Sequence, residues 1–226
     1  MPRTAAPNNT FRFVQWLMAF ALRATDALLV IDMQIDFLPG GALAVTGGDQ
    51  IIPGINALAA RFDHVILTQD WHPTGHISFA STHNLSPFTD TTDAPYGKQT
   101  LWPDHCVQGS PGAALHPDLD IPHTELILRK GFRRDIDSYS AFTENDGTTP
   151  TGLAGYLRER NLQRLFFTGV AYDFCVGFSA LAAAKLGFES IVIDDLTRAV
   201  GLPGTVDATN KAFANENIQL NQSLQF

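Results

Sequence analysis

The stretch Ala-Leu-Leu-Val-Ile-Asp at residues 27–32 decides the fold of this chain. It is a nearly continuous apolar run ending in a carboxylate, which is typical of a parallel strand covered by helices on both faces. Similar runs follow, separated by segments with apolar residues at helical spacing. We predict strands at 27–32, 64–69, 125–130, 165–170, 190–194 and, more weakly, 217–221, and helices at 50–61, 151–160, 174–186 and 206–215. This alternation predicts an α/β fold, a three-layer α/β/α arrangement around a central, parallel, six-stranded, Rossmann-like sheet.

Length and composition favour one globular domain that acts on a small molecule. The chain has 226 residues, 45% of them hydrophobic, so it can bury a core, and we assign residues 26–226 to a single domain. Its 15 Lys and Arg against 23 Asp and Glu give a formal net charge of −8, which repels phosphate groups. We therefore expect a small-molecule substrate, with neither nucleic acid nor a membrane as partner. The sequence is also compatible with a homo-oligomer.

Residues 1–25 differ from the rest of the chain, because they hold three arginines and no acidic residue. We interpret them as an N-terminal extension that is disordered or not native, with Met18 as a candidate natural start; a targeting segment is the alternative. No apolar run approaches the ~18 residues of a membrane-spanning helix. The two cysteines, Cys106 and Cys175, are too few for a disulfide scaffold and suit a reducing compartment, so we expect a cytoplasmic protein.

The long connection at residues 70–123 interrupts the alternation of strands and helices. Loops of more than about 15 residues in a compact domain are usually functional. Six of the seven histidines lie in this connection, namely His72, His76, His83, His105, His116 and His123. A polar surface loop is the alternative interpretation, but the concentration of histidines favours a functional one.

Reactive side chains follow four of the predicted strands, at the point where each strand ends. Asp32, Asp70 and Lys130 stand at three strand ends, and Cys175 comes shortly after the strand at 165–170. Because the carboxyl ends of parallel strands share one edge, we expect these side chains to converge. A thiol at a helix N-terminus beside a lysine has its thiolate favoured, and a nearby carboxylate can carry its proton. Each residue alone fits a structural role better, but together they predict a cysteine nucleophile with its base.

A second set of residues has the chemistry of a metal site. Asp70 and His72 lie two positions apart, and His105 follows later in the same connection. Carboxylate and imidazole ligands suit Zn²⁺, Mn²⁺ or Fe²⁺, with positions left open for water or substrate. His76 is either a fourth ligand or a donor behind the ligands. A structural metal loop beside an inert buried thiol is the alternative.

Several motifs in these segments carry a family resemblance. Two of them are Asp-Trp-His-Pro at 70–73 and Trp-Pro-Asp-His-Cys-Val at 102–107, and further matching segments lie at 30–45, 137–142 and 169–176. Together they resemble the nicotinamidases, a metal-binding branch of the isochorismatase-like cysteine hydrolases, over almost all of residues 27–220. The resemblance implies the isochorismatase-like hydrolase fold.

The resemblance implies catalytic roles for residues at the sheet edge. Cys175 matches the family nucleophile, Asp32 its base and Lys130 the third catalytic residue. The oxyanion site falls on the backbone amides of Ala171 and Cys175, with a cis peptide bond between Val170 and Ala171.

The resemblance also implies a metal and a substrate site. The metal ligands fall on Asp70, His72 and His105, which would hold one divalent ion, with zinc preferred over manganese or iron. The substrate contacts fall on Phe37, Trp102 and Ala171, of which the two aromatic residues enclose the pyridine ring.

The activity that the resemblance implies is hydrolysis of nicotinamide to nicotinate and ammonia through a thioester, in NAD salvage, with pyrazinamide as a second substrate. Tyr172 stands where the family usually has threonine and either crowds the nucleophile loop or points outward. Cys106 is interpreted as a buried structural thiol. The rival interpretations are a sister hydrolase acting on isochorismate, a carbamoyl amine or a ureido compound, and a catalytically silent protein that kept the fold.

Overall fold

The central sheet has six parallel strands. The structure, a computed structural model, describes residues 21–88 and 91–226, and there the strands follow the order β5-β2-β1-β6-β7-β8. They are β1 (Asp26–Ile31), β2 (His64–Asp70), β5 (Leu126–Lys130), β6 (Arg164–Val170), β7 (Glu189–Arg198) and β8 (Gln219–Asn221). Every neighbouring pair is parallel. The predicted six-stranded parallel sheet is confirmed.

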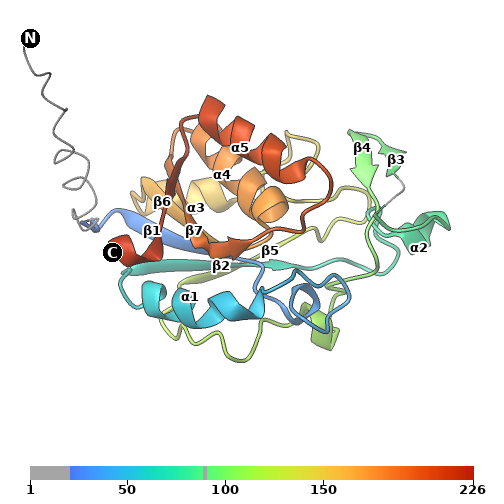
Figure 1. Ribbon diagram of the computed structural model, residues 1–226. Helices are drawn as coiled ribbons and strands as arrows, with labels where there is room; N and C mark the ends of the chain where they lie inside the picture. Colours follow the sequence, from blue (N-terminus) through green and yellow to red (C-terminus); the bar gives the residue numbers. More distant parts are fainter. Residues whose placement is uncertain (1–20, 89–90) are drawn as a thin grey trace, which may run out of the picture.

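Helices cover both faces of this sheet (Figure 1). One face carries α1 (Ile52–Ala59), and the other carries α3 (Leu153–Glu159), α4 (Gly177–Lys185) and α5 (Thr205–Asn215). The division follows from the topology, because the chain moves outward from β1 in one direction and from β6 in the other. Right-handed crossovers then place the helices of the two halves on opposite faces. The predicted three-layer arrangement is confirmed.

The long connection contains a short helix and a hairpin that were not predicted. They are α2 (Ala80–His83) and an antiparallel hairpin of β3 (Thr91–Ala94) and β4 (Gly97–Thr100). The hairpin strands read Thr-Thr-Asp-Ala and Gly-Lys-Gln-Thr, so no hydrophobic periodicity marks them.

The predicted helix at 174–186 begins differently from the expectation. Residues Tyr172–Val176 form a π-helical turn, and the α-helix starts only at Gly177. Single π-helical turns occur frequently at functional sites. The turn therefore draws attention to Cys175, which lies within it.

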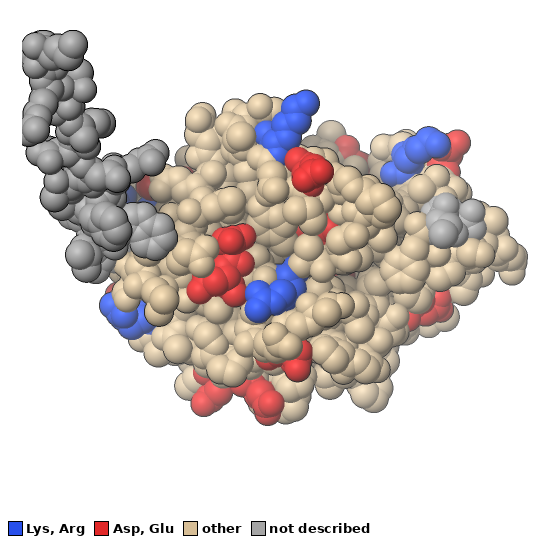
Figure 2. Space-filling model, in the orientation of Figure 1, with Lys and Arg blue, Asp and Glu red and all other residues tan. Residues whose placement is uncertain are grey.

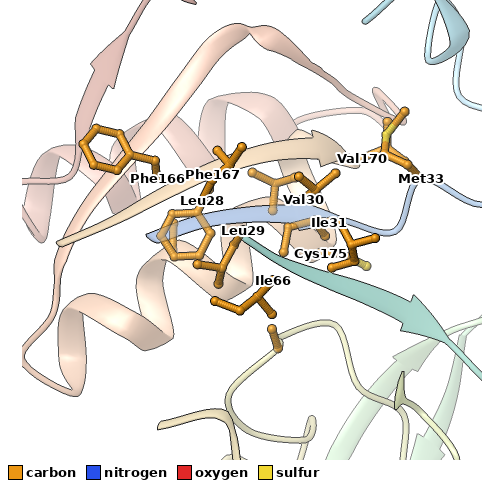
Figure 3. Close-up of a cluster of buried hydrophobic side chains, with 14 of the residues drawn as sticks. Leu28, Leu29, Val30, Ile31, Met33, Ile66, Phe166, Phe167, Val170 and Cys175 are labelled. Atoms are coloured by element: carbon orange, nitrogen blue, oxygen red, sulfur yellow. The ribbon is translucent and has the colours of Figure 1, made fainter. Parts of the chain in front are cut away.

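The core is centred on β1 and β6 (Figure 3). All residues of these two strands are buried, including Leu28, Ile31 and Phe166, which are 0% exposed. Full burial of such a side chain contributes roughly 1.5–3 kcal/mol. Cys175 lies at one end of this cluster, near the carboxyl end of β1. Two fully buried strands thus lead to the sheet edge where the reactive residues were predicted.

The predicted N-terminal extension lies largely outside the described residues, which begin at 21. Residues 21–25 contact the domain, since Arg164 Nη2 donates to Ala21 O at 2.9 Å and Leu22 packs against the core. Among the helices of the described ranges, none is long and apolar enough to cross a membrane. On the face drawn in Figure 2, the Lys and Arg residues of the described chain are scattered and form no basic patch.

Candidate active site

The strand ends bring the four predicted reactive residues together. The strand order reverses between β1 and β6, and open α/β sheets bind ligands outside the carboxyl ends of the strands at such a point. Asp32 follows β1 with a φ of +48°, and Cys175 lies in the turn after β6. Asp70 and Lys130 end β2 and β5 and are direct partners in the ladder. Ligand atoms of Asp32, Asp70 and Cys175 all lie within 4.8 Å of one another.

Lys130 is the buried centre of this group. Its Nζ lies 2.8 Å from Asp32 Oδ2 and donates to Asp70 Oδ1 (2.5 Å), to the Ser138 carbonyl (3.0 Å) and to Cys175 Sγ (3.4 Å). Burial works to lower the pKa of Lys130, but the charges of Asp32 and Asp70 hold it well above its ordinary value. The ammonium therefore stays charged and compensates the two buried carboxylates.

Asp32 is held by β2 as well as by Lys130. Thr68 Oγ1 accepts a hydrogen bond from Asp32 N at 3.1 Å and donates one to Asp32 Oδ1 at 2.6 Å. Burial raises the pKa of Asp32, and Lys130 opposes this effect without cancelling it. A carboxylate with raised proton affinity is suited to take a proton from a neighbouring thiol and return it.

The resting state of Cys175 differs from the expectation of a favoured thiolate. Its side chain is buried within the π-helical turn that precedes α4. Burial raises the pKa of Cys175 well above its ordinary value, Lys130 offsets this only in part, and Asp32 and Asp70 add to it. The sulfur is therefore a thiol at neutral pH and needs a base to become a nucleophile.

The predicted metal ligands Asp70, His72 and His105 form one buried cluster. Their three ligand atoms lie within 4.8 Å of one another. His72 Nδ1 lies 2.8 Å from Gly131 O, and His105 Nδ1 lies 2.8 Å from Pro103 O. Because a carbonyl only accepts, each one fixes a proton on Nδ1 and leaves the Nε2 lone pair free for a metal. The donor set fits a divalent ion such as zinc.

The protonation states of the cluster also suit metal binding. Burial works to raise the pKa of Asp70, but Lys130 and His72 hold it well below its usual range. Burial, with His72, lowers the pKa of His105 to about 4. An ionised carboxylate and a neutral imidazole are the forms that ligate metals. Burial works to lower the pKa of His72, but the charge of Asp70 raises it above its ordinary value. The raised pKa favours a second proton on the ring, and a bound metal would displace this proton.

His76 lies directly behind one of these ligands. Its ring stacks on that of His72 with centroids 4.2 Å apart. Its Nδ1 lies 2.7 Å from Ser78 Oγ and its Nε2 lies 3.3 Å from Ile136 O. His72, His76 and Asp137 form a second buried group whose ligand atoms lie within 4.8 Å of one another. The structure thus places His76 beside the cluster, in contact with His72.

A small cavity beside Cys175 is lined by all three predicted substrate contacts, Phe37, Trp102 and Ala171. Asp137, Tyr139 and Phe174, for which no role was predicted, also line it. The rings of Trp102 and Phe174 pack edge to face with centroids 4.9 Å apart, and those of Tyr139 and Phe174 at 5.4 Å. Aromatic walls of this kind suit a flat ring as ligand.

The remaining expectations concern the nucleophile loop and the second cysteine. The peptide bond between Val170 and Ala171 is cis, as expected. Tyr172 points toward α5, where its hydroxyl donates to Asn210 Oδ1 at 2.5 Å and its ring meets Phe213. Cys106 is fully buried, in agreement with its interpretation as a structural thiol.

Three residues that hold the site were not predicted. Gln34 binds the backbone of Asp70 at both atoms, accepting from N at 2.7 Å and donating to O at 2.8 Å. Thr68 holds Asp32, and Gly131 leaves room for His72, because a Cβ there would lie 2.4 Å from His72 Cε1. The one signal available was Thr68, a buried hydroxyl directly after the apolar run Val-Ile-Leu of β2, since a buried hydroxyl needs a partner.

The comparison with known proteins agrees with this geometry. A family model, the isochorismatase domain, matches residues 26–221. The chain belongs to the isochorismatase family. This isochorismatase-family chain is 56% identical to a nicotinamidase of Acinetobacter baylyi over 181 residues, which cover 80% of this chain and 84% of that protein.

Three solved structures have folds similar to that of this isochorismatase-family chain. An Acinetobacter baumannii nicotinamidase and pyrazinamidase has a TM-score of 0.88 and 48% identity, covering 90% of this chain and 99% of that one. A protein of L. infantum in complex with nicotinate has a TM-score of 0.80 and 41% identity, covering 92% and 98%. A pyrazinamidase of Pyrococcus horikoshii in complex with zinc has a TM-score of 0.72 and 33% identity, covering 88% and 99%.

Proposed function

We propose that this chain is a nicotinamidase, which hydrolyses nicotinamide to nicotinate and ammonia and acts on pyrazinamide in the same way. The observation that carries the proposal is the buried group of Asp32, Lys130 and Cys175 beside a metal-binding set and an aromatic cavity. The A. baylyi relative is a nicotinamidase, and the L. infantum structure holds nicotinate. The nicotinate released would enter NAD salvage.

Substrate binding brings the carboxamide to the thiol. The pyridine ring lies between Phe37 and Trp102. This binding holds the carboxamide in a fixed orientation near Cys175, which lowers the entropic cost of the reaction. Asp70, His72 and His105 would hold a divalent ion, which would supply a Lewis acid that orients the substrate. We expect zinc, the metal in the P. horikoshii structure, although manganese or iron suits the same donors.

The first half of the reaction forms a thioester. Asp32 takes the proton of Cys175 as Sγ attacks the carboxamide carbon. The backbone amides of Ala171 and Cys175 donate to the oxyanion that develops on the carboxamide oxygen. The proton then passes from Asp32 to the amide nitrogen, the C–N bond breaks and ammonia leaves. Lys130 keeps its positive charge and stabilises the negative charge shared by the carboxylate and the sulfur.

The second half hydrolyses the thioester. A water gives a proton to Asp32 and its oxygen attacks the thioester carbon, supported by the same two amides. The C–S bond breaks, the sulfur regains its proton from Asp32, and nicotinic acid leaves and loses its carboxyl proton to water to give nicotinate. The two halves together consume one water and one amide and return the site to its starting state.

The cellular setting follows from composition. Both cysteines are free thiols, which suits a reducing compartment, and we place the enzyme in the cytoplasm. The net charge of −8 favours a small-molecule substrate over nucleic acid or an anionic membrane surface.

The nucleophile is tested with two cysteine variants and ammonia release from nicotinamide. We expect Cys106→Ala to keep most of the activity of the parent. Cys175→Ala should lose at least about a thousandfold in kcat, because no other group forms the thioester. Calorimetry should show that this variant still binds nicotinamide. Ordinary turnover by Cys175→Ala would rule out the nucleophile assignment.

The metal and the substrate are tested by chelation and reconstitution. Release of ammonia should disappear with the metal and return when zinc, manganese or iron is restored. Turnover that survives complete metal removal would contradict the role of Asp70, His72 and His105. A folded protein that releases no ammonia with any metal would instead favour a sister hydrolase acting on other amides or ureido compounds.

A further inference from the structure

The β3–β4 hairpin carries one buried side chain. Among the residues of these two strands, which the structure describes in full, Gln99 alone is buried, with 1% of its surface exposed. The hairpin stands beside α2 and apart from the central sheet (Figure 1). Trp102, which lines the cavity, follows β4 closely in the chain. Buried polar groups need hydrogen-bond partners, so the partners of Gln99 identify what the hairpin is attached to.

The amide of Gln99 joins the hairpin to the segment 137–139. Its Nε2 shares its two protons among three acceptors, Thr100 O at 2.7 Å, Asp137 Oδ2 at 2.9 Å and Tyr139 OH at 3.1 Å. Its Oε1 accepts from Tyr96 OH at 2.9 Å, and that hydroxyl accepts from Asp137 N at 3.2 Å. The side chain of Gln99 therefore links the β3–β4 hairpin to the segment 137–139, and the central sheet makes no such link.

Tyr139 extends this link to the wall of the cavity. Its hydroxyl oxygen accepts from Trp102 Nε1 at 3.2 Å as well as from Gln99. Its ring meets those of Phe174 and Trp102 edge to face, with centroids 5.4 and 6.4 Å apart. All three rings line the cavity beside Cys175. Gln99 is thus one residue removed from the space that a ligand would occupy.

We propose that Gln99 is a positioning residue that sets the affinity of the site for its aromatic substrate. It holds Tyr139 directly and, through the shared hydroxyl, it holds Trp102. The role requires an amide, because leucine neither donates nor accepts and glutamate would bring a second carboxylate to Asp137. Without Gln99 the wall loses its fixed geometry, whereas Asp32, Lys130 and Cys175 keep theirs. The inference rests on the proposed function, in which Trp102 contacts the pyridine ring.

The kinetic test compares Gln99→Leu with Lys98→Gln, a neighbour that points to the exposed side of β4. We expect Gln99→Leu to raise KM for nicotinamide about tenfold with kcat within about threefold, as for a loss of substrate binding. Lys98→Gln should change neither. Tyr139→Phe should raise KM similarly, and the double variant should add little, because both residues act through one hydroxyl. An unchanged KM in Gln99→Leu, or fully multiplicative effects in the double variant, would overturn the proposal.

A second readout needs no turnover. The indole N–H resonance of Trp102, identified by its loss in Trp102→Phe, should shift in Gln99→Leu and in Tyr139→Phe but not in Lys98→Gln. An unshifted resonance in folded Gln99→Leu overturns the positioning role even where the parent hydrolyses nicotinamide. A shifted resonance in a protein without turnover supports the positioning of Trp102 and contradicts the proposed function alone. If Gln99→Leu does not fold, Tyr96→Phe takes its place, because it removes the nearer donor to Gln99 Oε1 and leaves only Asn145 Nδ2 at 3.5 Å. The indole resonance should then shift in the same direction by a smaller amount, and an unshifted resonance there also overturns the proposal.

Discussion

Thr68 Oγ1 binds Asp32 at two points, accepting from its backbone amide at 3.1 Å and donating to Oδ1 at 2.6 Å. Lys130 Nζ lies 2.8 Å from the other carboxylate oxygen, Oδ2. Both oxygens of Asp32 are therefore held from other strands, one from the adjacent β2 and one from β5 beyond it. The orientation in which the carboxylate faces Cys175 is a property of the assembled sheet edge and not of β1 alone.

Thr68→Val removes the hydroxyl with little change of shape. We expect kcat for nicotinamide about tenfold lower, because Asp32 loses its fixed orientation, and KM changed less than about twofold. Thr68→Ser keeps the hydroxyl and should stay within about twofold of the parent in kcat. Steady-state ammonia release measures both values. Equal kcat for the valine and serine variants would show that the hydroxyl does not position Asp32 for catalysis.

The ion pair of Asp26 and Arg164 should contribute strongly to stability. Arg164 Nε and Nη2 donate to the two carboxylate oxygens at 2.8 and 2.5 Å, and the side chains are 5% and 1% exposed. Asp26→Ala leaves the guanidinium buried without its carboxylate, which should cost roughly 3–5 kcal/mol in the free energy of unfolding. Glu189→Gln removes the exposed pair with Arg23, and there we expect a loss below about 1 kcal/mol. Denaturant unfolding compares the two, and similar losses would contradict the importance of burial.

Gly131→Ala should weaken metal binding. The residue has a φ of +65°, and a Cβ would lie 2.4 Å from Cε1 of the His72 ring, so the ring must move. We expect zinc affinity about 10–100-fold lower, as measured by competition with a chromogenic chelator. Gly147→Ala is the matched control, because its φ is +71° and nothing lies within 4 Å of the added carbon. Equal loss of affinity in both variants would assign the effect to backbone strain instead of the collision with His72.

Glu144 should make stability depend on pH. It is 2% exposed; one carboxylate oxygen pairs with Arg133, and the other has no hydrogen-bond partner among the described residues. Burial raises the pKa of Glu144 above 4.5, with Arg133 opposing. The folded state then holds this proton more tightly than the unfolded chain, so the contribution is full below pH 4.5 and is lost as pH rises through the folded pKa.

Glu144→Gln removes this titration. The difference in free energy of unfolding between variant and parent should therefore move in favour of the variant as the pH rises above 4.5. Denaturant unfolding of both proteins at a series of pH values measures the difference. A difference that stays constant with pH would contradict the raised pKa.

Sequence patterns predicted the reactive residues better than the residues that hold them. Asp32, Asp70 and Lys130 were predictable because each follows an apolar strand, and the edge where parallel strands end is common to all of them. Gln34 and Gln99 could not be predicted in this way, because their side-chain amides bind partners that are remote in the chain. Gln99 and Tyr139, for example, are 40 residues apart. The β3–β4 hairpin was missed for the related reason that its residues carry no apolar alternation.

The sequence by itself determined the parallel α/β architecture, because nearly continuous apolar strands are stable only when helices cover both faces of the sheet. It also determined which residue types meet at the sheet edge. Only the tertiary structure decided the protonation state of Cys175, since the pKa of its thiol depends on burial and on the charges of Lys130, Asp32 and Asp70, which come from remote parts of the chain. It likewise decided which ring nitrogen of His72 is free, because the backbone carbonyl of Gly131, 59 residues away in the chain, fixes the proton on the opposite nitrogen.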